Sequence, residues 1–254
     1  MGTSCLLETK GLGRSFEGFA ALKGLDFSLA NGEIHAIIGP NGAGKTTFFR
    51  LIFGEIPPSS GKVIFKGKDI TGLSPWQICR LGIGRSYQIT NIFPQLSIHE
   101  NIRMAVQAKR LVYNFWSSTD SFNTFHEKAI NIMGEIGLES RMGEVAANLS
   151  HGEQRKLEIG LALASEPELL LLDEPTAGMS MDETKQTVKL IQKIARERTL
   201  TILMVEHKMD VVYAIADRIT VFHQGSVLST GSPDNIRNNE QVKSVYFRGR
   251  KEHA

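Results

Sequence analysis

Two short segments of the chain carry residue types that suit phosphate chemistry. The first, GPNGAGKTT (39–47), matches the pattern G-x-x-x-x-G-K-[ST] between an apolar stretch and a helical one. Gly42 and Gly44 let the backbone bend so that several N–H groups face one anion, and the dipole of the following helix adds to that attraction. Lys45 supplies positive charge for the β- and γ-phosphates, and the Thr46 hydroxyl can bind Mg²⁺. We therefore predict a nucleoside triphosphate site at Gly39, Pro40, Asn41, Gly42, Ala43, Gly44, Lys45, Thr46 and Thr47.

The second segment is LLLLDEP (169–175), an apolar run that ends in two acidic residues. In an α/β sheet the carboxyl ends of the strands lie where ligands bind. We expect Asp173 to hold the Mg²⁺ and Glu174 to polarise a water for in-line attack on the γ-phosphorus. Acidic residues often end strands, so these two residues alone do not identify a metal site. We assign the roles to Asp173 and Glu174 because a phosphate loop lies upstream in the same chain.

A third segment, LSHGE (149–153), begins a helix. Ser150 and Glu153 have the spacing of a capping box, and an apolar stripe starts at Leu157. The cap explains the helix start, but it does not explain why a histidine and a glycine occupy its first turn. Two further polar residues, Gln88 and His207, lie in a loop and at a strand end, where each alone is compatible with a structural role.

An α/β framework is needed to position these residues. Leu25, Phe27 and Leu29 alternate with polar residues, and Asn31-Gly32 then predicts a hairpin that leads into the strand EIHAIIG (33–39). The apolar runs 168–174 and 200–207 are typical of buried parallel strands. Further predicted elements are a strand with a glycine turn at 62–70, short and long helices at 74–77 and 181–197, and a hairpin at 218–231 turning at Gln224-Gly225.

This order predicts an α/β fold with a P-loop NTPase core around a parallel sheet, an N-terminal antiparallel β layer and an inserted α-helical subdomain. We expect a single domain over residues 1–254. Approximately residues 1–88 and 165–254 form the β layer and the nucleotide-binding core, and approximately residues 89–164 form the helical subdomain.

The composition of the chain excludes or disfavours several classes of function. The 254 residues include 29 basic and 27 acidic ones, so bulk charge does not favour nucleic-acid binding. No apolar run approaches the ~20 residues of a membrane span, and no hydrophobic signal region opens the chain. Two distant cysteines suggest neither a disulfide framework nor a metal site, which indicates a reducing cytoplasm. We expect any membrane role to come through a partner.

Taken together, the phosphate loop, Gln88, LSHGE, LLLLDEP, AGMS (177–180) and His207 resemble, in this order, the ATP-binding cassette family. The resemblance covers nearly the whole chain and implies ATP and Mg²⁺ as cofactors. It implies that Phe16 stacks on adenine, that Gln88 touches Mg²⁺ or water, and that His207 orients the γ-phosphate and the attacking water. Glu174, His207, Gln88 and Lys45 are then the catalytic residues, and Thr46, Gln88 and Asp173 the metal ligands.

The resemblance also implies what the residues of LSHGE bind. In this family two subunits pair head to tail, and the signature of each closes over the nucleotide of the other. Ser150, Gly152 and Glu153 would therefore face a partner's ATP, with the amides of the first turn suited to its γ-phosphate. A simple capping box is the structural alternative. The signature departs from the commonest one at His151 and Glu153, and the carboxylate of Glu153 repels phosphate unless it turns back to cap the helix.

Within the family, the single cassette and the long insert resemble the subunits that import branched-chain or other hydrophobic amino acids, with urea and amide importers as relatives. This implies a second ATPase subunit, identical or paralogous, transmembrane permease subunits and, indirectly, an extracytoplasmic solute-binding protein. The cassette would then be peripheral, on the cytoplasmic side of the cell (inner) membrane. In 91–101, Ile92, Phe93 and Leu96 would contact the permease, or alternatively pack inside the insert.

Three other functions compete with the importer. A DNA-linked ATPase of this family would carry a long coiled coil between phosphate loop and signature, and residues 46–149 contain none. A ribosome-linked ATPase of this family normally has two cassettes in one chain, whereas this sequence contains one phosphate loop. A module that binds ATP without hydrolysing it stays open, given the altered signature. The aromatic segment 109–125 is expected to be a surface insertion packed on the helical part, rather than a lipid contact.

Overall fold

The computed structural model describes residues 5–86, 92–111 and 120–248, with side chains described outside 109–111, 120–123 and 246–248. The chain forms two compact units, Met1–Ile78 with Thr199–Ala254, and Cys79–Arg198. We describe each unit by itself. The second unit contains the predicted helical segment 89–164 together with strands and a long helix beyond it. The predicted subdomain boundaries stay a prediction.

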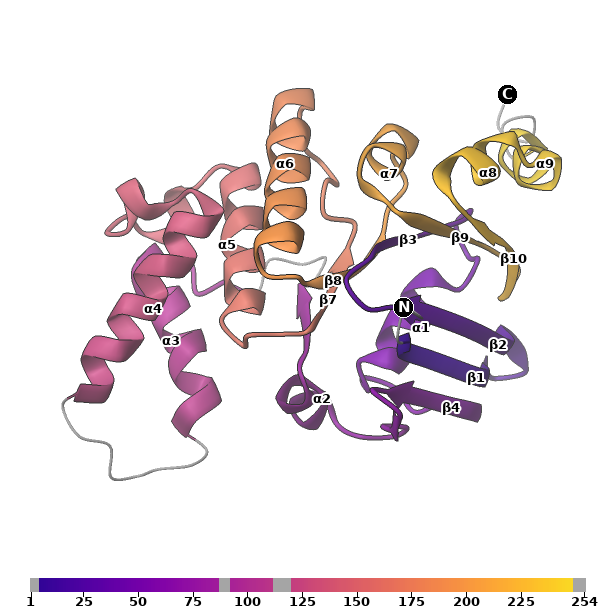
Figure 1. The fold of residues 1–254 in the computed structure, drawn as a ribbon, viewed down its shortest axis with the longest axis horizontal. Coiled ribbons are helices and arrows are strands. Elements are labelled where there is room, and N and C mark those ends of the chain that lie inside the picture. Colours follow the sequence, from indigo (N-terminus) through magenta and orange to yellow (C-terminus); the bar gives the residue numbers. More distant parts are fainter. Residues whose placement is uncertain (1–4, 87–91, 112–119, 249–254) are drawn as a thin grey trace. The chain divides into compact units, whose positions relative to one another are not determined.

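The first unit begins with an antiparallel layer (Figure 1). Its strands have the order β2-β1-β4-β5, and β1 and β2 form a hairpin around Glu17 and Gly18, which both have positive φ. Alternating burial along β2 places Leu25, Phe27 and Leu29 on the buried face, as a half-buried strand requires. The strands are β1 (Cys5–Phe16), β2 (Phe19–Ala30), β4 (Ser60–Phe65) and β5 (Lys68–Asp69).

The second layer of this unit contains the strands that lead to the phosphate loop. β3 (Ile34–Ile38) is buried at every position and pairs in parallel with both β8 (Thr201–Val205) and β9 (Arg218–His223). Full burial on both faces explains why four of its five residues are apolar, the exception being the buried His35. β10 (Ser226–Gly231) pairs with β9 through the predicted Gln224-Gly225 turn, which is confirmed. The helices are α1 (Lys45–Ile52), α2 (Pro75–Leu81), α7 (Met209–Ile215), α8 (Pro233–Asn238) and α9 (Glu240–Arg248), with α2 crossing into the second unit.

One predicted pairing is wrong. Asn31-Gly32 does turn the chain, but β2 and β3 do not form a hairpin with each other. β2 pairs with β1, whereas β3 lies between β8 and β9. The physical reason is that β3 is buried on both faces, so it belongs inside a parallel layer, while the alternating β2 needs a solvent-facing side.

The second unit combines a short parallel pair with helices. β6 (Ile83–Ser86) pairs with β7 (Leu169–Asp173), in register from Ile83 with Leu169 to Ser86 with Leu172. Helices α3, α4 and α5 pack together, and α6 lies beside α5 (Figure 1). The helices are α3 (Ile98–Leu111), α4 (Asp120–Ile136), α5 (His151–Leu163) and α6 (Met181–Glu197), with single turns of 3₁₀-helix at Glu139–Arg141 and Ala146–Asn148.

The predicted α/β class is confirmed, because both units combine helices with β-strands.

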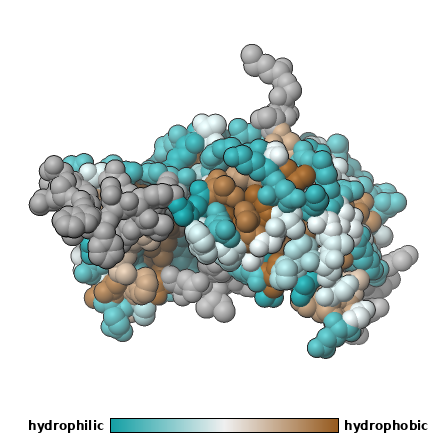
Figure 2. All heavy atoms as spheres, turned by 90° about the horizontal axis from the view of Figure 1, so that it is seen from below, coloured by the Kyte–Doolittle hydropathy of each residue, from teal (hydrophilic) through white to brown (hydrophobic). Residues whose placement is uncertain are grey.

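On the face drawn in Figure 2, hydrophilic residues cover much of the surface, with hydrophobic groups between them. Large apolar side chains that are exposed among the described residues are Phe16, Phe19, Trp76, Phe93, Met104, Val145 and Met181. Within the described parts of the chain, no helix combines the length and apolarity needed to cross a membrane.

Candidate functional site

The phosphate loop connects β3 to α1, as the sequence predicts. Lys45 is the first residue of α1 and is only 6% exposed. Its ammonium group donates to the carbonyl oxygens of Gly39, at 2.7 Å, and Pro40, at 3.0 Å. The loop therefore wraps around its own lysine, and the positive charge is held where an anion on the loop would meet it.

Close contacts explain two of the loop glycines. A Cβ on Gly39 would overlap the carbonyl oxygen of Phe222, and a Cβ on Gly44 would lie 2.7 Å from the carbonyl oxygen of Ala21. Gly44 also has a φ of 101° as the N-cap of α1, a conformation that disfavours side chains. The loop is held in turn by Gly225, whose N–H donates to the carbonyl of Ala43 at 3.1 Å.

Several other predicted residues of this unit are accessible, whereas Ala43 is buried. Asn41, Gly42 and Thr46 are exposed and Thr47 is half-buried, so the Thr46 hydroxyl is available to a ligand. Phe16 ends β1 and is 38% exposed, with the Arg14 guanidinium carbon 4.7 Å from its ring centroid. The Phe16 ring is exposed and already contacts a cation, so it is suited to stacking on a planar group such as the predicted adenine.

His207 leaves the sheet at the edge from which the phosphate loop starts. Ile37 pairs with Val205 in parallel, so Gly39 and His207 each follow two residues later at the same strand ends. The buried carboxylate of Glu206 accepts from the N–H of His207 at 2.6 Å and from that of Lys208 at 3.0 Å. This carboxylate sets the backbone direction from which the exposed imidazole projects. Sequence reasoning missed it, because a glutamate in MVEH has no recognisable signal.

In the second unit, Asp173 ends β7 and is 2% exposed. Its Oδ2 accepts from Arg85 on the neighbouring strand β6 at 3.2 Å, while its Oδ1 has no hydrogen-bond partner among the described residues. Burial raises the pKa of the Asp173 carboxyl, and the nearby Arg85 charge opposes that rise. A buried carboxylate oxygen without a partner suits a metal ligand.

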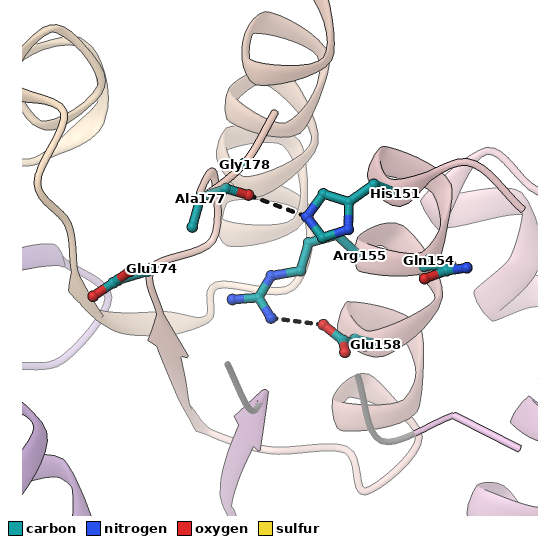
Figure 3. A pocket seen from close by; sticks show the side chains of 7 residues that line it. All are labelled: His151, Gln154, Arg155, Glu158, Glu174, Ala177 and Gly178. Carbon is teal, nitrogen blue, oxygen red and sulfur yellow. Dashed lines mark hydrogen bonds and ion pairs between the residues drawn. The ribbon is translucent and has the colours of Figure 1, made fainter. Parts of the chain in front are cut away.

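Glu174 lies beside a pocket of about 280 Å³ within the same unit (Figure 3). Its φ of 47° falls in the left-handed region, which costs a non-glycine residue about 1 kcal/mol and is common at functional sites. Arg155 on α5 reaches across this region, donating to Glu158 at 2.6 Å and to the backbone carbonyl of Asp173. The pocket is lined by His151, Gln154, Arg155, Glu158, Glu174, Ala177 and Gly178.

The predicted capping box at the start of α5 is confirmed. The Ser150 hydroxyl accepts from the Glu153 amide at 3.3 Å, and Glu153 Oε2 accepts from the Ser150 amide at 3.0 Å. The Glu183 side chain at the start of α6 lies against Gly152, because a Cβ on Gly152 would be 2.9 Å from Glu183 Oε1. Hydrogen bonds with Ser180 lower the pKa of the Glu183 carboxyl. His151 Nε2 lies 3.2 Å from the carbonyl oxygen of Ala177, as the dashed line in Figure 3 marks.

Comparison with known proteins identifies the family. A family model described as ABC transporter matches residues 22–177. The chain belongs to the ABC transporter family. It is 37% identical over 248 residues to the high-affinity branched-chain amino acid transport ATP-binding protein LivG of Escherichia coli (strain K12), covering 95% of this chain and 97% of that protein. To the corresponding protein BraF of Pseudomonas aeruginosa it is 35% identical, with the same coverage.

Solved structures agree with this membership. The crystal structure of the ADP conformation of an ATP-binding cassette of an ABC transporter has a TM-score of 0.85 and 27% identity, and the match covers 96% of this chain and 99% of that one. This ABC cassette is accordingly an ATPase that binds ATP or ADP. The individual roles of its residues stay predictions, and Gln88 lies outside the described residues.

Three arginines of the ABC cassette had no signal in its sequence. Arg85 and Arg155 contact Asp173, and Arg141 contacts Glu153. Their partners lie 88, 18 and 12 residues away along the chain. No local motif joins such positions, so only the folded chain identifies these contacts.

Proposed function

We propose that this chain is the ATP-hydrolysing subunit of an importer for branched-chain or other hydrophobic amino acids. The observation that carries the proposal is similarity along almost the entire chain to transport ATP-binding proteins for branched-chain amino acids, including LivG. In this function ATP draws two cassettes together, and its hydrolysis lets them separate.

The phosphate loop binds the nucleotide in this proposal. Lys45 exchanges the carbonyls of Gly39 and Pro40 for the β- and γ-phosphate oxygens, so its charge does not have to be brought from solvent. The accessible Phe16 ring stacks on the adenine. The Gly152 amide, in the first turn of α5, donates to the γ-phosphate of the nucleotide on the second cassette.

Mg²⁺ fits the residues available. The Oδ1 atom of Asp173, which has no hydrogen-bond partner in the described parts of the chain, and the exposed Thr46 hydroxyl would hold it, with Gln88 as a further ligand. Bound Mg²⁺ neutralises charge on the β- and γ-phosphates. Glu174 accepts the proton of the attacking water, and His207 orients the γ-phosphate and that water.

A Glu174→Gln variant tests the catalytic assignment. We expect it to bind ATP and to dimerise with ATP while its turnover falls by about a hundredfold or more, because an amide cannot accept the proton. Turnover is measured by steady-state phosphate release and dimerisation by size-exclusion chromatography with ATP. Turnover near the original rate would remove Glu174 from the mechanism, and dimerisation without turnover in the unchanged protein would favour a binding module.

The segment 92–96 is the proposed contact with the permease. Phe93 is 52% exposed, while Ile92 and Leu96 are half-buried. Buried Asn101 holds this loop by donating to the carbonyl of Phe93 at 3.0 Å and accepting from its amide at 2.8 Å. The loop therefore presents an aromatic anchor on a rigid support.

Co-purification from detergent-solubilised membranes tests this contact and the peripheral location on the cytoplasmic side of the inner membrane. We expect permease subunits to accompany the cassette, and Phe93→Ala to weaken their recovery. Phe19→Ala, at another exposed phenylalanine, is the matched control and should leave recovery unchanged. Uptake assays with branched-chain amino acids and with urea or amides then separate the two importer classes, and recovery of DNA or ribosomes in place of permeases would contradict both.

A further inference from the structure

Arg141 forms a bridge between two carboxylates beside the start of α5. Its Nε and Nη2 donate to Glu144 at 2.8 and 2.6 Å, and its Nη1 donates to Glu153 Oε1. Arg141 lies in the 3₁₀ turn Glu139–Arg141, whereas Glu153 lies in the first turn of α5. The guanidinium is about one-third exposed and Glu153 about one-quarter exposed, so the pair is only partly screened by water.

Glu153 creates an electrostatic problem for the proposed function. Its carboxylate lies in the same helical turn as the amides proposed to receive a γ-phosphate, and two anions in one turn repel each other. Both of its oxygens are occupied, however. Oε1 accepts from Arg141 and Oε2 accepts from the Ser150 amide, so the carboxylate is turned back toward the cap.

The capping box also leaves room for a phosphate. It engages the amides of Ser150 and Glu153, and not those of His151 and Gly152. The Glu183 carboxylate lies against Gly152, where a Cβ would be 2.9 Å from its Oε1, so this turn already has a second carboxylate beside it. A second anion is tolerated here while Arg141 is paired with Glu153.

We propose that Arg141 is a positioning residue for ATP, which neutralises Glu153 and holds it against the cap so that the α5 turn accepts the γ-phosphate of the opposing cassette. This inference rests on the proposed function, in which the signature faces a nucleotide on a second copy. Arg141 itself does not touch the reacting atoms. It acts through the charge and direction of Glu153.

Matched charge variants test the proposal in the chain carrying Glu174→Gln. We expect Arg141→Gln to raise the ATP concentration for half-maximal dimerisation about fivefold at low salt, and less at high salt. Adding Glu153→Gln should restore the original value, because it removes the uncompensated charge in the turn. Adding Glu144→Gln to Arg141→Gln gives the same net charge but leaves Glu153 ionised, and should not restore it.

A second measurement separates this role from a structural one. In the catalytically intact chain, Arg141→Gln should raise the KM for ATP with little change in kcat, and Arg141→Lys should lie between Arg141→Gln and the original. Melting temperatures of all variants report folding. If Arg141→Gln/Glu153→Gln and Arg141→Gln/Glu144→Gln behave alike, or if Arg141→Gln leaves the ATP dependence unchanged, the inference is wrong.

The proposed function fails in a different way. If the Glu174→Gln chain with Arg141 intact binds ATP but never dimerises, then the signature has no opposing nucleotide to face, and both proposals fall together. If that chain dimerises normally and only the Arg141 series shows no effect, the importer function stands and Arg141 has a structural role alone.

Discussion

The Arg85 guanidinium lies 3.2 Å from Asp173 Oδ2, and the two side chains are 4% and 3% exposed. Such burial removes both ions from water, so the pairing compensates part of the cost of burying each charge. The pairing also directs the carboxylate, because only Oδ1 then stays without a hydrogen-bond partner among the residues described. β6 and β7 bring the two residues together through their parallel register.

Arg85→Met should reduce the free energy of unfolding by about 3–5 kcal/mol, because it leaves a buried carboxylate without its nearest cation. Urea unfolding measures this loss. Lys128→Met is the control, since Lys128 pairs with Glu166 at 2.7 Å but both side chains are about half exposed, and its loss should stay below about 1 kcal/mol. Equal losses of unfolding free energy in Arg85→Met and Lys128→Met would contradict the claim that burial makes the Arg85–Asp173 pair more important for stability.

The phosphate loop predicts unequal costs for two glycine substitutions. Gly42→Ala places a Cβ in open space at a φ of 76° and should cost about 1–2 kcal/mol of stability. Gly39→Ala drives a Cβ into the Phe222 carbonyl and should cost about 1 kcal/mol or more beyond that. Chemical unfolding without nucleotide compares the two variants. A smaller loss of stability for Gly39→Ala than for Gly42→Ala would contradict the prediction and show that the backbone of β9 moves aside at little cost.

The capping boxes of α5 and α6 provide a matched pair. Ser150 and Ser180 form the same reciprocal capping box with Glu153 and Glu183, and the Ser180 hydroxyl also donates to Glu183 at 2.8 Å. Replacing either serine with alanine should lower stability by about 1 kcal/mol. Only Ser150→Ala should also weaken ATP-dependent dimerisation, because only α5 is proposed to meet the opposing nucleotide. Equal weakening by Ser180→Ala would mean that general helix stability, rather than contact with ATP, controls dimerisation.

A buried network at the start of β3 predicts a pH dependence. Burial raises the pKa of the Glu33 carboxyl, but hydrogen bonds from His35 and the Ala30 amide outweigh it and hold the pKa below its ordinary value of 4.5. The folded state therefore binds its proton more weakly than the unfolded state, so the stabilisation is present above about pH 4.5 and is lost as the pH falls through the lower folded value. His35 continues the network to Thr220 at 2.8 Å.

Glu33→Gln should accordingly be less stable than the original protein near neutral pH, by about 1 kcal/mol. The difference should shrink as the pH falls below about 4.5, because the original carboxyl then becomes protonated. Unfolding midpoints measured across this range report the effect. A difference that stays constant with pH would mean that the Glu33 charge contributes nothing to stability.

Local signals predicted much of the site. The phosphate loop, the strand that ends at Asp173 and both hairpin-like turns at 66–67 and 224–225 depend on residues within a few positions of one another. The capping box at Ser150 and Glu153 is equally local. Such features are determined by backbone geometry and nearby hydrogen bonds, which neighbouring residues control almost entirely.

By itself, then, the sequence determined the class of fold, the phosphate loop with Lys45 and the acidic strand end at Asp173 and Glu174. Only the tertiary structure decided that β2 and β3 join different sheets, and that Arg85, Arg155 and Arg141 are the partners of Asp173 and Glu153. The physical reason is distance along the chain. An arginine carries the same charge wherever it stands, and which carboxylate it compensates depends on the burial and strand register that arise when remote segments pack.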